Sequence, residues 1–108
     1  MTKISLNAVV RDLLTHARAA GSGRDATTVH GGHDRSLRQT VIALRQGEHI
    51  HEHEHPGEVT VHVLYGWARL VAGPDSWDGQ PGDLLVMPRR RHRVEAVQDC
   101  ALLFTAAR

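Results

Sequence analysis

The chain has 108 residues, nine of them histidine, and a formal net charge of +1 when the histidines are neutral. This length suits one domain with one hydrophobic core, and the near-zero charge creates no overall attraction to nucleic acid or to an acidic membrane surface. No stretch approaches the roughly 20 apolar residues of a membrane span, and the one cysteine, Cys100, excludes an intrachain disulfide. We therefore expect a single cytoplasmic domain over residues 1–108, with no nucleic-acid partner and no membrane partner.

Residues 6 to 20 predict one amphipathic α-helix. Its apolar residues recur at helical spacing and form one stripe, which consists of Leu6, Val9, Val10, Leu13, Leu14 and Ala17. Ser5 is suited to cap the start of this helix, and Gly21 is suited to end it. Residues 1–21 would thus form an N-terminal helical extension, packed against the rest of the domain or against a partner subunit.

From residue 37 onward, short β-type runs alternate with turns rich in glycine, proline and aspartate. The predicted strands are residues 37–44, 59–65, 68–72, 84–87, 94–97 and 101–105. Residues 21–36 read as a loop with a short strand at Thr27 to His30, and residues 75–79 read as a loop anchored by Trp77. Many short strands without intervening helices predict a β-sandwich or a β-barrel.

The run from residue 47 to residue 58 carries four histidines at alternating positions: His49, His51, His53 and His55. Alternate side chains of a strand point to the same face, so two neighbouring imidazoles of this run can converge on one metal ion. All four cannot do so, because the first and last would lie roughly 20 Å apart in a straight strand. The alternative is a solvated His/Glu edge that binds metal only loosely.

Two spaced motifs extend this pattern. The first consists of Gly47, five residues, His53-Glu54-His55, Glu58 and Gly66, and the second of Gly82, five residues, Pro88 and His92. Over residues 37–108 the chain resembles the cupin superfamily. The resemblance implies a mainly β fold, a double-stranded β-helix or jelly-roll barrel, with one N-terminal α-helix. It also implies a single metal inside the barrel, held by His53, His55, a residue of the next strand and His92.

The chain departs from the cupin pattern where a glutamate ligand is usual. That position carries Val59, and Glu58 stands one residue early, which would turn its side chain to the other strand face. His62 would replace the missing ligand if the even-numbered face of residues 59–65 looked into the barrel. If the odd-numbered face looked inward instead, His62 would be a surface histidine. A one-step change of register would also allow His51 to pair with His53. In the second motif, the proline-to-histidine interval is one residue short, and Arg90 replaces a frequent glycine.

A ligand set of histidines suits a divalent transition metal, with Zn, Ni, Fe, Cu and Mn not distinguished. Four arginines surround His92: Arg89, Arg90, Arg91 and Arg93. They form either a cationic rim that attracts an anionic small-molecule ligand or a solvated turn.

Two classes of function remain open. One is a metal-dependent enzyme such as an oxygenase or an isomerase, although the missing glutamate counts against a standard dioxygenase site. The other is a non-catalytic cupin, a ligand sensor or an accessory or structural dimer. We expect a homodimer, because the helix and the odd-numbered face of residues 59–65 together offer more apolar surface than a small barrel needs.

Overall fold

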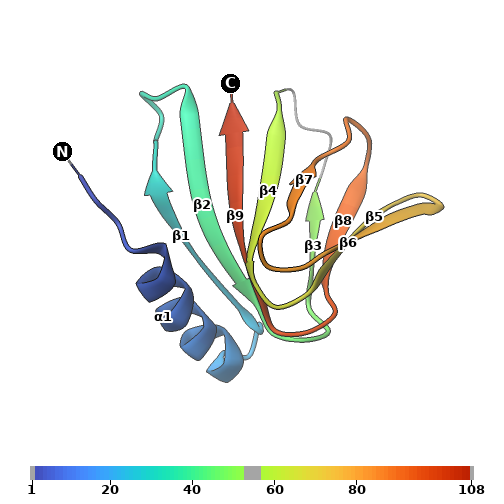
Figure 1. Ribbon diagram of the computed structural model, residues 1–108, viewed down its shortest axis with the longest axis horizontal. Coiled ribbons are helices and arrows are strands. Elements are labelled where there is room, and N and C mark those ends of the chain that lie inside the picture. Colours follow the sequence, from blue (N-terminus) through green and yellow to red (C-terminus); the bar gives the residue numbers. More distant parts are fainter. Residues whose placement is uncertain (1, 53–56, 108) are drawn as a thin grey trace.

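The computed structural model describes residues 2–52 and 57–107. It contains the helix α1 (Leu6–Ala19) and the strands β1 (Arg24–His30), β2 (Leu37–Leu44), β3 (His49–Glu52), β4 (Val59–Tyr65), β5 (Ala68–Ala72), β6 (Asp75–Gly79), β7 (Leu84–Val86), β8 (His92–Ala96) and β9 (Cys100–Ala107). The strands form a five-stranded sheet of order β1-β2-β9-β4-β7 and a four-stranded sheet of order β3-β8-β5-β6. The strand pairings are antiparallel, and the helix lies beside β1 and β2 (Figure 1). The prediction of a mainly β jelly roll with one N-terminal helix is confirmed.

The helix follows its predicted stripe closely. The Ser5 hydroxyl accepts a hydrogen bond from the Ala8 amide at 3.2 Å and so caps the first turn. Ala20 is already extended, and the left-handed residue after the helix is Gly23, at φ 67°, rather than Gly21. The apolar stripe is buried against the outer face of the five-stranded sheet, where Val41, Ala43 and Leu103 receive it. None of the helices in the described ranges is long and apolar enough to cross a membrane.

A second core fills the space between the two sheets. Its buried members include Leu44, Val61, Val63, Leu70, Val94 and Leu102, with Met87 and Phe104. Aliphatic side chains of both sheets interdigitate there, as in other jelly rolls. The five-stranded sheet therefore buries one face in the barrel interior and part of its other face under the helix.

Three strands lie outside the six strand ranges predicted from residue 37 onward. β1 begins at Arg24 and pairs with β2 from Gln39 to Leu44, whereas only Thr27 to His30 were expected to be extended. β3 covers the first half of the histidine run. β6 replaces the predicted loop around Trp77, because residues 75–79 pair one for one with β5 across the tight turn at Gly73 and Pro74.

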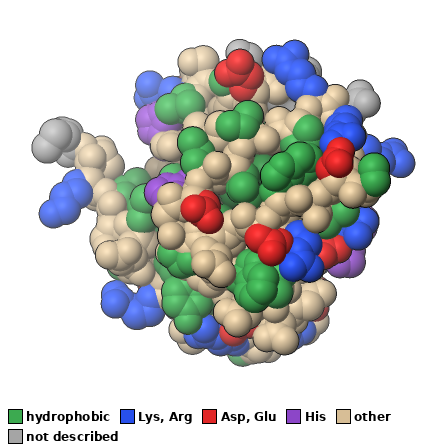
Figure 2. Space-filling model, turned by 45° about the vertical axis from the view of Figure 1, so that its right-hand side comes forward, with side chains coloured by type: hydrophobic (Ala, Val, Ile, Leu, Met, Phe, Trp, Pro, Cys, Tyr) green, Lys and Arg blue, Asp and Glu red, His purple; other side chains and the backbone are tan. Residues whose placement is uncertain are grey.

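The apolar surfaces expected to support a homodimer are mostly not free. The helix stripe is covered by the sheet, and Val61 and Val63 lie inside the barrel. Apolar exposure is found instead on the edge strand β7, where Leu84 is 61% exposed and Val86 is 72% exposed. Figure 2 shows hydrophobic side chains in the middle of one face of the molecule, with charged groups around them.

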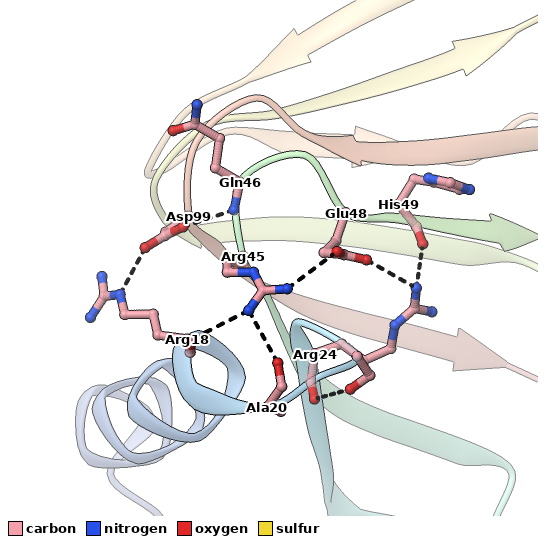
Figure 3. Close-up of polar contacts among 9 residues, drawn as sticks. Arg18, Ala20, Arg24, Arg45, Gln46, Glu48, His49 and Asp99 are labelled. Carbon is pink, nitrogen blue, oxygen red and sulfur yellow. Dashed lines mark hydrogen bonds and ion pairs between the residues drawn. The ribbon is translucent and has the colours of Figure 1, made fainter.

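An ion pair and hydrogen bonds connect the helix to one end of the barrel (Figure 3). Arg18 Nε donates to Asp99 Oδ2 at 2.7 Å, and Asp99 Oδ1 accepts from the Gln46 amide at 2.8 Å. Arg45 donates to the carbonyl oxygen of Ala20 at 3.1 Å. These bonds connect the last turn of α1 to the β2–β3 turn and to the start of β9. They fix the helix on the sheet.

Candidate metal centre

His92 is the buried polar residue of the described core. Its strand alternates buried and exposed positions, and the inward positions after it, Val94 and Ala96, belong to the barrel core. The side chain of His92 is therefore directed into the barrel by the register of β8, and only 5% of the residue is exposed. The position that the second cupin motif assigns to a ligand thus faces the interior.

The two ring nitrogens of His92 have different surroundings. Nδ1 lies 2.9 Å from the carbonyl oxygen of Arg90. Because a carbonyl oxygen can only accept, Nδ1 carries the proton and Nε2 of the neutral ring keeps its lone pair. Nε2 is buried and has no hydrogen-bond partner among the described residues. Metal-binding histidines typically show this arrangement, with one nitrogen held by a carbonyl and the other free for an ion. His92 therefore fits a metal ligand. The Arg90 carbonyl that orients it was not foreseen, since its role depends on backbone geometry alone.

β4 turns its odd-numbered face, and not the even-numbered face that would make His62 a ligand, into the barrel. Val61 and Val63 lie in the barrel core, and Val59 packs against it. His62 pairs across the sheet with Leu103 and with Leu84, which lie on the outer face. Directly paired residues of antiparallel strands share a face. The placement of His62 inside the barrel is therefore wrong, and its imidazole cannot meet Nε2 of His92 within the core.

The orientation of β4 also shows where the usual glutamate ligand of the cupin motif would point. Val59, at the usual ligand position of the motif, does point toward the core, whereas Glu58 is exposed. The inward position is thus present, and a valine occupies it. On this strand, the described interior offers no metal-binding side chain.

The histidine run meets His92 through β3. The backbone register pairs Glu52 with His92 and Ile50 with Val94. Ile50 packs against the barrel core, whereas His49 and His51 are exposed and their rings meet edge to face at 4.6 Å. His53 and His55 lie outside the described residues. Within the described ranges, no three His, Cys, Asp or Glu side chains gather as metal ligands.

Two of the arginines around His92 form ion pairs, and two of them line a pocket. Arg90 donates to Asp75 Oδ2 at 2.6 Å, and Arg93 donates to Glu95 Oε1 at 2.6 Å. A pocket of about 450 Å³ lies beside them, lined by His51, Val71, Gly73, Arg91, His92 and Arg93. Arg93 pairs in register with His51 and with Val71, so this pocket opens on the outward side of the four-stranded sheet. Its lining is cationic and next to the candidate metal ligand.

Comparison with known proteins places this geometry in a fold family. No protein-family profile and no curated protein sequence matches the chain. Among solved structures, an RmlC-like cupin protein from Desulfovibrio desulfuricans is 27% identical, with a TM-score of 0.68 over 78% of this chain and 81% of that one. The Cupin_2 domain of an XRE family transcriptional regulator from Enterobacter cloacae is 10% identical, with a TM-score of 0.70 over 79% of this chain and 96% of that domain.

A third similar structure is the G106A mutant of salicylate 1,2-dioxygenase from Pseudoaminobacter salicylatoxidans. It is 17% identical, and the TM-score is 0.72 over 94% of this chain but only 32% of the dioxygenase. Proteins described as cupins recur among the similar structures, and the two antiparallel sheets agree with that fold. By its fold, this chain is a small cupin.

Proposed function

We propose that this protein binds one divalent transition metal in the barrel through His92 and the His-x-His pair His53 and His55. The observation that carries the proposal is the buried, unpartnered Nε2 of His92, with Nδ1 held by the Arg90 carbonyl. Leaving such an atom unpaired costs about 1–3 kcal/mol, and coordination would remove that cost. Neutral imidazoles favour Zn, Ni, Fe, Cu or Mn over Mg and Ca, which prefer oxygen ligands.

The proposal places one demand on the histidine run. Ile50 faces the core, and strict alternation would give the inward parity to even-numbered positions. The register of β3 pairs its last residue, Glu52, with His92. For His53 and His55 to be ligands, the alternation has to change after Glu52.

The ligand of such a site is proposed to be small and anionic. Arg91 and Arg93 line the pocket on the outward side of the sheet next to His92, where Arg93 is paired with Glu95 and Arg91 adds positive charge. When bound, the metal would supply Lewis acidity and an open coordination position for a polar ligand. The protein's own residues would orient His92, exclude water by the aliphatic barrel core and attract the anion.

Two uses of this site are proposed as alternatives. One is a metal-dependent reaction of the oxygenase or isomerase type, and the similar dioxygenase structure supports it. The other is ligand sensing without catalysis, supported by the similar domain of a transcriptional regulator. The valine at position 59 favours the second, because the described interior offers no carboxylate to act as an acid or a base.

The decisive experiment is metal content by mass spectrometry on purified wild type and histidine variants. We expect one metal per chain in wild type, loss of the metal in His92→Ala, and full retention in the matched control His62→Ala, whose side chain lies on the outer face. Occupancy should fall below about pH 6, where protons compete for free imidazoles. Full occupancy in His92→Ala would overturn the proposed site. Loss in His53→Ala and His55→Ala, with retention in His51→Ala, would establish the change of alternation.

We also propose a homodimer in the cytoplasm. The exposed Leu84 and Val86 on the edge strand β7 support an association through this edge, and the buried free thiol of Cys100 suits a reducing compartment. Light scattering should give twice the chain mass of 11.9 kDa. Charged substitution in the variant Val86→Lys should return the monomer, and a monomeric wild type would refute the dimer.

A further inference from the structure

A second hollow lies outside the barrel, between the helix and β4. It measures about 310 Å³, which is at the lower end of the size range of small-molecule sites. The lining residues are Asn7, Val10, Arg11, Leu14, Thr15, Arg18, Leu64 and Tyr65. This hollow is separate from the candidate metal centre, because it opens on the outer face of the five-stranded sheet, on the side of α1.

The floor of the hollow is apolar. Val10 and Leu14 are buried in the core under the helix, and Leu64 packs against the same core from β4. Leu64 has this position because the even-numbered face of β4 points outward. The same orientation places His62 outside the barrel. An apolar floor of this kind gains free energy when a hydrocarbon group displaces water from it.

The rim of the hollow is positively charged. Asn7, Arg11 and Arg18 follow one another along one side of α1, at spacings of four and seven residues that keep them on one helix face. Arg11 and Arg18 are about 10 Å apart along the helix axis. None of the residues that line the hollow is acidic.

The two guanidinium groups differ in their partners. Arg18 Nε donates to Asp99 Oδ2 at 2.7 Å (Figure 3), so this guanidinium group already has a carboxylate partner. Arg18 and Tyr65 both line the hollow. The Arg11 side chain has no ion pair or hydrogen bond with the rest of the described chain. Its backbone carbonyl accepts from the Thr15 hydroxyl at 3.0 Å. Arg11 is therefore the cation that is free to take a carboxylate.

We propose that this hollow binds a small amphipathic carboxylate. Its carboxylate pairs with Arg11, and its hydrocarbon part lies over Leu14 and Leu64 toward Tyr65. A guanidinium and a carboxylate form charge-assisted hydrogen bonds that are roughly twice as strong as neutral ones. The apolar floor alone would accept any hydrocarbon, and the rim alone would attract any anion. The combination selects a molecule that has both parts.

The test uses octanoate as the probe, with 1-octanol as its neutral counterpart, and amide NMR of the full chain as the readout. We expect saturable shifts at residues 7–18 and at Leu64 and Tyr65 with octanoate, and at least tenfold weaker binding with octanol. Arg11→Gln should weaken octanoate binding about tenfold. The free variant should give the spectrum of a folded protein, because the Arg11 side chain is exposed. The matched control Arg38→Gln removes an exposed arginine of β2 and should bind like wild type.

Three outcomes would overturn the proposal. Unchanged binding in Arg11→Gln would remove the carboxylate contact, and equal binding of octanol would reduce the site to hydrophobic adsorption. Shifts centred on Val94 and Ala96 would place the probe inside the barrel. His92→Ala should keep octanoate binding at the helix, so failure of the metal centre and failure of this site are separable.

Discussion

Gly66 connects β4 to β5 at the point where the chain passes closest to the start of β9. Its φ of 80° lies in the left-handed region, which residues with a Cβ rarely adopt. A Cβ added there would meet the carbonyl oxygen of Asp99, and it would lie 2.8 Å from both the Asp99 carbonyl carbon and Cys100 Cα. These atoms belong to the backbone, so no side-chain rotation can relieve the contact. Gly66→Ala therefore forces the β9 segment to move.

The cost can be estimated from what that movement disturbs. The left-handed conformation costs about 1–2 kcal/mol for alanine. Displacing Asp99 weakens its bonds to Arg18 and to the Gln46 amide, at about 1 kcal/mol each. Displacing Cys100, which is buried where β9 enters the barrel core, adds an overpacking cost of about 1–3 kcal/mol. We expect a loss of roughly 4–7 kcal/mol, a large part of the stability of a domain of this size.

Gly47→Ala is the matched control. Gly47 has a φ of 90°, but an added Cβ would find no atom within 4 Å. This variant should carry only the conformational cost, about 1–2 kcal/mol. Urea unfolding followed by tryptophan fluorescence measures both variants. If Gly66→Ala were as stable as Gly47→Ala, the backbone contact at position 66 would not be what requires glycine there, and this result would refute the argument.

Three further predictions concern the helix, the thiol and the ion pair. Leu14→Ala should lower the free energy of unfolding by about 2–4 kcal/mol, since the buried Leu14 fills the core under α1, and thermal unfolding would show this as a lower Tm. Burial raises the pKa of the Cys100 thiol to about 12, so iodoacetamide at pH 8 should label it only in urea, and rapid labelling of the native protein would contradict its burial. The hydrogen bond from Arg18, followed by that from the Gln46 amide, lowers the pKa of Asp99. Its stabilising contribution is therefore present above the unfolded value of about 3.9 and is lost as pH falls through the lower folded value. Asp99→Asn should cost about 1 kcal/mol at pH 7 and less below pH 4, as measured by urea unfolding, and a pH-independent difference would contradict the ion pair.

Much of the fold could be predicted from local patterns. The helix stripe, the Ser5 cap and most strands of the barrel follow from periodicity and turn residues, and these features are observed. β6 was missed because Asp75, Ser76 and Asp78 favour turns in isolation. Its strand conformation comes from pairing with β5, a tertiary effect that overrides the weak propensity of an exposed edge.

The orientation of β4 could not be decided from its own residues. Its odd positions carry valines, and its even positions carry Thr60, His62 and Leu64. Both sets are compatible with burial, because one face lies on the barrel core and part of the other lies under α1. The location of the helix decides between the two orientations, since Leu64 packs against the core beneath α1 when the even-numbered face points outward. A local pattern does not contain that information.

The orientation of β4 also changes the chemistry expected of the barrel interior. With Val59 inward and His62 outward, the described interior presents mainly apolar side chains together with Nε2 of His92. A divalent ion held only by imidazoles would keep its full charge in a medium of low dielectric constant, where an uncompensated charge is costly. Under the proposed function an anionic ligand would compensate this charge, and Arg91 and Arg93, which lie on the outward side of the sheet next to His92, would attract an anion to this part of the molecule. Under the proposed function, the valine at position 59 and the arginines near His92 would belong to one arrangement, in which a bound anion would take the electrostatic role of a protein carboxylate.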